Sequence, residues 1–124
     1  MRLKLLIAAA VLLPSIASAQ SMNAEAFYKR SNALIAKGPL ALFSRGEINL
    51  LMTEAQNAGK AARSQRLSAV AAGKPPRACP PDQSKMGSDE FMKRLGAIPA
   101  ADRARINMTE AMTRITIARF PCPR

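Results

Sequence analysis

The sequence predicts an all-α protein, a small bundle of about four helices with one disulfide. Apolar residues recur at spacings of three and four in several segments of the 124-residue chain, which is the period of an amphipathic helix. Asn, Ser, Gly and Pro stand at the borders of these segments, where helices begin and end. No run of alternating apolar and polar residues is long enough to predict a β-strand.

The first 19 residues predict an export signal. Arg2 and Lys4 precede an uncharged apolar run over residues 5–13, and the small residues of Ala17-Ser18-Ala19 fit a signal-peptidase site. We expect cleavage before Gln20 and a mature chain that is exported to the periplasm or secreted. The alternative is an uncleaved anchor, but only about 15 residues are apolar enough to insert, fewer than the roughly 20 that span a bilayer.

Residues 20–73 are expected to form a region resembling a helical hairpin. Asn23 is placed to cap a first helix over residues 24–37, and Gly38 to end it. Pro39 then opens a short linking turn that runs through Phe43.

The second helix of this region is expected to be long, over residues 45–72. Ser44 and Glu47 have the spacing of a capping box, in which each side chain bonds the other residue's backbone N–H. Gly73 and the following prolines end the helix. At 1.5 Å per residue it would reach about 40 Å, so we expect either a bend at Gly59 or an exposed end. Its apolar face is formed by Ile48, Leu51, Met52, Ala55, Ala62 and Ala69.

The remainder is expected to be a connector, residues 74–87, followed by a two-helix unit over residues 88–124. Ser88 is placed to cap a short helix that Gly96 closes. A last helix is predicted from Pro99 to about residue 119, and Pro121 ends it.

Two cysteines lie at the ends of this C-terminal part, Cys79 in the connector and Cys122 after the last helix. Because an exported protein with only two cysteines commonly joins them, we expect one disulfide. It would close a loop of about 44 residues and stabilise the fold by about 4 kcal/mol in the chain-entropy model.

The mature chain is strongly basic, with 17 Lys and Arg against 8 Asp and Glu, a net charge of +9. Such charge favours an acidic protein, anionic lipid or nucleic acid as partner, or serves solubility alone. Export and the lack of an aromatic stacking platform argue against nucleic acid. Five cations between residues 55 and 81, without an intervening acid, form the candidate binding stripe, with an ordinary solvated face as the alternative: Lys60, Arg63, Arg66, Lys74 and Arg77.

The composition gives little support to an enzyme. The chain has no histidine, which removes Ser-His-Asp and Cys-His arrangements and most zinc sites. A disulfide would occupy both thiols, and no glycine-rich phosphate loop is present. We therefore expect no catalytic, cofactor-binding or metal site.

The C-terminal third resembles the Rap/Tai family of type VI secretion immunity proteins. The resemblance rests on Cys79-Pro80-Pro81, a short helix, and a helix that terminates in Phe120-Pro121-Cys122-Pro123, over residues 79–123. It implies a helical, disulfide-bonded periplasmic protein that binds a peptidoglycan-cleaving amidase toxin. Residues 94–100 depart from the family's pattern, since they lack the His and Glu of its turn between the two helices.

Two functional expectations result. The first is a non-enzymatic exported binding protein that acts as a toxin inhibitor. The alternative is a basic envelope protein whose helix binds an acidic partner or an anionic membrane surface. Self-association into a homodimer is compatible with both.

Overall fold

The computed structural model describes residues 21–124, which form an all-helical fold with one disulfide, as predicted. The predicted export signal lies outside the described residues. Among residues 21–124 there is no β-strand, and Asn23 and Asn107 form an isolated antiparallel bridge. The helices are α1 (Ala24–Ala36), the 3-10 helix η1 (Gly38–Phe43), α2 (Arg45–Ala71), α3 (Ser88–Ala97), α4 (Ala100–Arg103) and α5 (Met108–Arg119).

Helix α1 begins and ends where the sequence predicts, within one residue. The Asn23 side chain accepts a hydrogen bond from the backbone N–H of Ala26 at 3.1 Å. Gly38 has a φ of +55°, a conformation that glycine adopts readily. The following segment is a 3-10 helix rather than an open turn, since Pro39 fits its first turn.

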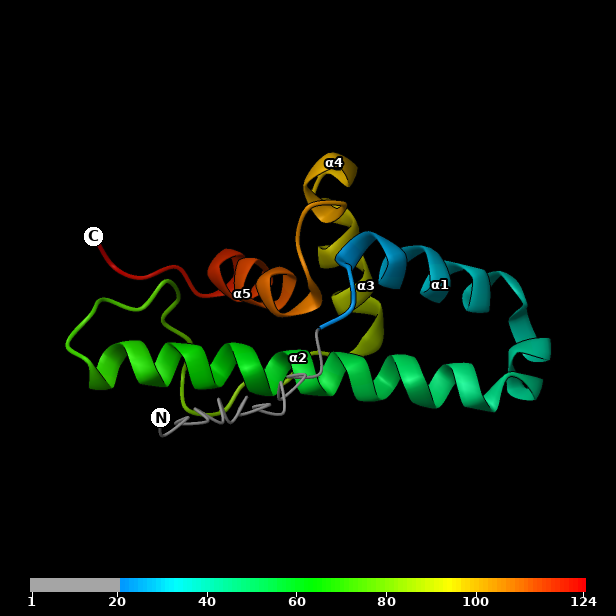
Figure 1. Ribbon diagram of the computed structural model, residues 1–124, viewed down its shortest axis with the longest axis horizontal. Helices are drawn as coiled ribbons and strands as arrows, with labels where there is room; N and C mark the ends of the chain where they lie inside the picture. Colours follow the sequence, from blue (N-terminus) through cyan, green and yellow to red (C-terminus); the bar gives the residue numbers. More distant parts are fainter. Residues whose placement is uncertain (1–20) are drawn as a thin grey trace, which may run out of the picture.

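Helix α2 runs as one unbroken rod along the long axis of the molecule, without a bend at Gly59 (Figure 1). The alternative expectation, an exposed helix end, is confirmed, because the residues of its last turns are largely exposed. Of its predicted apolar face, Leu51 is buried while Met52 is 55% exposed.

The predicted capping box at the start of α2 is wrong. The Ser44 side chain makes no cap hydrogen bond, and the Nζ of Lys37 donates to its Oγ at 3.1 Å. Both carboxylate oxygens of Glu47 accept from Arg30 of α1, each at 2.6 Å. A bidentate ion pair is stronger than a bond to one backbone N–H, so Glu47 joins α2 to α1 instead.

The C-terminal part contains three helices rather than two. The helix predicted from Pro99 divides into α4 and α5, because residues 106–108 bond to the chain at the start of α1. The N–H of Ala24 donates to the Ile106 carbonyl, and the N–H of Met108 donates to the Met22 carbonyl. Asn107 is extended and its side chain caps α5 by accepting from the N–H of Glu110 at 2.8 Å. Ser88 is the first residue of α3 and does not cap it, and Gly96 lies inside α3 instead of closing it.

The core sits where α5 crosses the middle of α2 and where α1 and α3 cover the junction (Figure 1). Phe27 of α1 meets Phe91 of α3 edge to face, with ring centroids 5.8 Å apart. The buried cluster consists of Ala24, Phe27, Leu51, Ala58, Leu95, Met108, Ala111 and Ile115. No helix within residues 21–124 combines the length and apolarity that crossing a bilayer would need.

A buried arginine joins α4 to α1 and α3. Arg103 is 6% exposed, and its Nε lies 2.6 Å from a Glu25 carboxylate oxygen. Its Nη1 donates to the carbonyls of Gly96 and Ile98, and its guanidinium lies 4.1 Å from the centroid of the Tyr28 ring. These contacts hold the short α4 in place.

Candidate binding surface

Three of the five predicted basic residues lie on the C-terminal half of α2. Lys60 and Arg63 are exposed, and Arg66 is half-buried. Lys74 is also exposed, in the turn after α2, where its N–H donates to the Ala69 carbonyl at 2.8 Å. These four therefore remain candidates for contact with a partner.

Arg77 has a different position, because it pairs with α5. Its two terminal nitrogens donate to the two carboxylate oxygens of Glu110, each at 2.8 Å. This hydrogen bond lowers the pKa of Glu110 and raises that of Arg77; Arg114 also bonds Glu110. Arg77 thus ties the connector to α5, and its guanidinium is engaged by a carboxylate that it shares with Arg114.

The structure adds a groove that the sequence did not predict. It has a volume of about 640 Å³ and lies between α2, residues 80–86 of the connector, and α5. We call it the basic groove, because Arg63, Arg66, Lys85 and Arg119 line it with Asp82 as the one carboxylate among its lining residues. An anionic surface of matching shape would meet several cations at once.

Lys85 and Arg119 are the members that sequence reasoning missed. They lie 19 and 53 residues beyond Arg66, and no local pattern relates them to α2. The expected disulfide was the one feature of the sequence that could have indicated this groove, since it places the connector beside the end of α5.

Arg119 fixes one wall of the groove. Its Nη2 donates to the Lys85 carbonyl at 3.0 Å, its Nε lies 3.6 Å from Glu90, and its guanidinium lies 4.8 Å from the centroid of the Phe120 ring. The pKa of Glu90 is lowered, first by its hydrogen bond from Arg94 and further by the charge of Arg119. The connector, which has no helix of its own, is thereby held against α5.

The disulfide secures the same connection. Cys79 and Cys122 are joined with an S–S distance of 2.05 Å, and the N–H of Cys79 donates to the Phe120 carbonyl at 2.9 Å. Ala78 beside it is buried, at 3% exposed. The connector is therefore covalently joined to the segment that follows α5.

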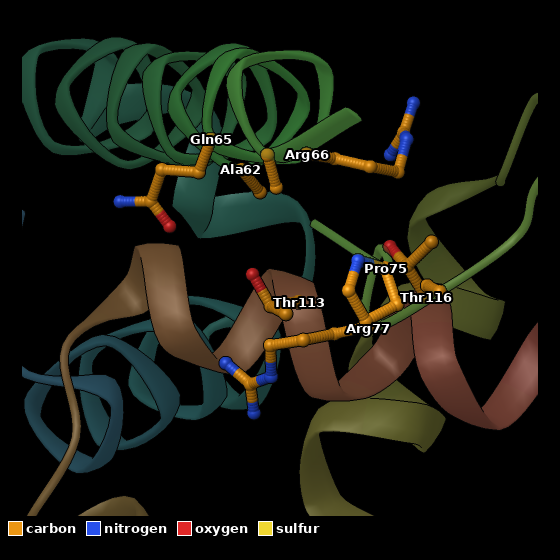
Figure 2. Close-up of a pocket in the computed structure, with 9 residues that line it drawn as sticks. Ala62, Gln65, Arg66, Pro75, Arg77, Thr113 and Thr116 are labelled. Carbon is orange, nitrogen blue, oxygen red and sulfur yellow. The ribbon is translucent and has the colours of Figure 1, made fainter. Parts of the chain in front are cut away.

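A smaller pocket of about 80 Å³ lies next to the groove, between α2, residues 75–78 and α5 (Figure 2). The guanidinium ends of Arg66 and Arg77 point away from one another there, so they do not converge on one ligand. The Thr113 and Thr116 hydroxyls donate to carbonyls of their own helix. This arrangement is typical of a packing gap between elements.

Within residues 21–124, no group of three or more Cys, Asp or Glu side chains is placed to hold a metal ion.

Comparison with protein-family models, with curated proteins and with solved structures finds no match for this chain. The class that the fold and the surface define is a disulfide-linked, all-helical domain with a basic groove, and the resemblance to the Rap/Tai family stays a prediction.

Proposed function

We propose that this chain is a non-enzymatic exported binding protein that receives an acidic protein surface in the basic groove. The observation that carries the proposal is one groove lined by Arg63 and Arg66 of α2 and by Lys85 of the connector. Arg119 of α5 holds the wall of this groove through its contacts with Lys85 and Glu90. The disulfide and the Arg119 contacts order the connector before binding. A surface that is already ordered loses less conformational entropy on association.

The resemblance suggests the kind of partner. An immunity protein of the Rap/Tai type would bind a peptidoglycan amidase toxin in the periplasm and block its activity. The helical fold and the joined cysteines are compatible with this more specific proposal. It rests on the sequence resemblance, whereas binding of an acidic protein rests on the groove.

A charge-matched pair of variants tests the groove. The processed chain would serve as bait in a pull-down from envelope extract, with Arg63→Glu/Lys85→Glu as the groove variant. Lys29→Glu/Lys93→Glu has the same net charge and changes exposed residues of α1 and α3. We expect the groove variant to lose a specific partner that the control retains. Equal loss in both would show attraction by net charge alone and would contradict the proposal.

The immunity proposal has its own test. The captured partner would be purified and assayed for release of peptides from peptidoglycan, with and without the chain. We expect cleavage that stoichiometric amounts of the chain suppress. A groove-dependent partner without such activity would refute the immunity role and leave the binding role intact.

A further inference from the structure

A second exposed surface lies at the far end of the molecule, where η1 joins α1 to α2 (Figure 1). Leu40 is 65% exposed, Leu42 67% and Phe43 89%, and Ile35 in the last turn of α1 is 62% exposed. We call these four residues the apolar tip. Large apolar side chains gathered on a protein surface commonly mark a site of interaction.

The fold itself does not need these side chains. The chain reverses through backbone hydrogen bonds, from the Leu40 N–H to the Lys37 carbonyl at 3.2 Å and from the Ser44 N–H to the Ala41 carbonyl at 2.8 Å. None of the residues of η1 is buried. Residues three apart in a 3-10 helix lie on the same side, so Leu40 and Phe43 project together.

The charges nearest the apolar tip are positive; the Glu47 carboxylate is close enough to Lys37 to interact with it, but it is paired with Arg30. There is no Asp or Glu between Glu25 and Glu47 in the sequence. Lys37 and Arg45, both exposed, flank the tip directly, and Lys37 is held at its base by its hydrogen bond to Ser44. Apolar side chains with a rim of Lys and Arg are the pattern by which peripheral proteins contact anionic lipid.

We propose that the apolar tip inserts into the headgroup region of an anionic bilayer, with Lys37 and Arg45 at the lipid phosphates. A two-fold contact between copies would bring these cations together in a chain of net charge +11, which disfavours self-association. The inference is independent of the protein-binding proposal, because the basic groove uses the opposite half of α2 and stays free.

The absence of tryptophan from the chain allows a direct test by fluorescence. Phe43→Trp places a single reporter in the apolar tip, and Leu67→Trp places one at a residue 52% exposed near the other end of α2. Both proteins would be purified after export, with the processed N-terminus verified by mass spectrometry. On vesicles of phosphatidylglycerol and phosphatidylethanolamine we expect a blue shift and quenching by brominated lipid for the Phe43→Trp protein alone. A shift at Leu67→Trp only, or at neither residue, would overturn the proposal.

Vesicle flotation with serine variants measures the contribution of the tip. Leu42→Ser/Phe43→Ser should lower the partition coefficient at least about tenfold, since apolar area no longer leaves water. Leu67→Ser/Val70→Ser, which also changes two half-exposed apolar residues of α2, should leave it unchanged. A larger loss of binding for Leu67→Ser/Val70→Ser than for Leu42→Ser/Phe43→Ser would assign membrane contact to the C-terminal half of α2. It would refute the proposal that the apolar tip inserts.

Two further measurements complete the test. Neutral phosphatidylcholine vesicles should bind weakly, since the proposal requires anionic phosphates beside Lys37 and Arg45. Sedimentation velocity should show a monomer for the unaltered chain and for the Leu42→Ser/Phe43→Ser protein. A dimer that this substitution dissociates would make the tip an interface between copies and would overturn the proposal.

Discussion

Arg103 shows that one buried charge can position several elements. Its guanidinium contacts Glu25, two carbonyls at the end of α3, and the Tyr28 ring. A buried ion pair of this kind adds little net stability compared with a well-packed apolar pair, but losing one partner leaves the other charge without compensation. The position of α4 therefore depends on both residues of the pair.

We predict that Arg103→Ala lowers the free energy of unfolding by about 3–5 kcal/mol, because the Glu25 carboxylate is left buried and unpaired. Urea unfolding followed by circular dichroism measures the change. Adding Glu25→Gln to this variant should recover part of the loss. If the double variant is as unstable as the sum of the two single variants, the ion pair is not the cause.

Gly96 is required by close packing and not by its backbone conformation. A Cβ at this position would lie 2.8 Å from the Tyr28 hydroxyl oxygen. Alanine is favoured over glycine inside a helix by roughly 1 kcal/mol, but the contact with Tyr28 outweighs this gain. We predict that Gly96→Ala destabilises the fold by about 1–2 kcal/mol net.

Gly59→Ala provides the matched control, because a Cβ there meets the flexible end of Met112 at 3.3 Å. This second substitution should be neutral or stabilising by up to about 1 kcal/mol. Thermal unfolding should therefore show a lower melting temperature for Gly96→Ala and an equal or higher one for Gly59→Ala. A higher melting temperature for Gly96→Ala would refute the packing argument.

At the scale of elements, helix starts depend on what else the capping residues can reach. Asn23 and Asn107 cap their helices with short local hydrogen bonds. Ser44 does not cap α2, because Glu47 forms an ion pair with Arg30 of α1 and Lys37 donates a hydrogen bond to the serine hydroxyl. A local motif therefore predicts a helix start correctly and its bonding partners incorrectly when a charged residue of another helix competes.

The ion pair between the connector and α5 predicts a pH dependence. The pKa of Glu110 lies below its ordinary value of 4.5 because Arg77 donates two hydrogen bonds to the carboxylate. Its contribution to stability is thus fully present above about pH 4.5 and is lost as the pH falls through the lowered pKa. Glu110→Gln should show a shallower fall in melting temperature below pH 4.5 than the unaltered chain. Parallel curves for the two proteins would contradict this assignment. Glu47 and Glu90, whose pKa values are also lowered, contribute to the slope that remains.

At the scale of the whole molecule, the disulfide joins two segments that contribute few buried side chains. Replacing Cys79 and Cys122 by serine should lower the free energy of unfolding by about 4 kcal/mol, since the loop between these cysteines, 43 positions apart, is no longer closed in the unfolded chain. Differential scanning calorimetry of the native, reduced and double-serine proteins measures the effect. Equal melting temperatures for all three would show that the non-covalent contacts of the connector suffice to hold it.

The sequence by itself determined the helical class, the start and end of α1, the length of α2 and the cysteine pair. These properties depend on residues close together in the chain, or on a count of two thiols with one pairing available. Tertiary structure decided the division of the last helix, because residues 22–24 take the backbone bonds of residues 106–108. It also decided which cations form the basic groove. Arg77 pairs with Glu110 and does not line the groove, while Lys85 and Arg119 lie beside α2. Charges respond to every neighbour in space, and the sequence order of this chain does not reveal those neighbours.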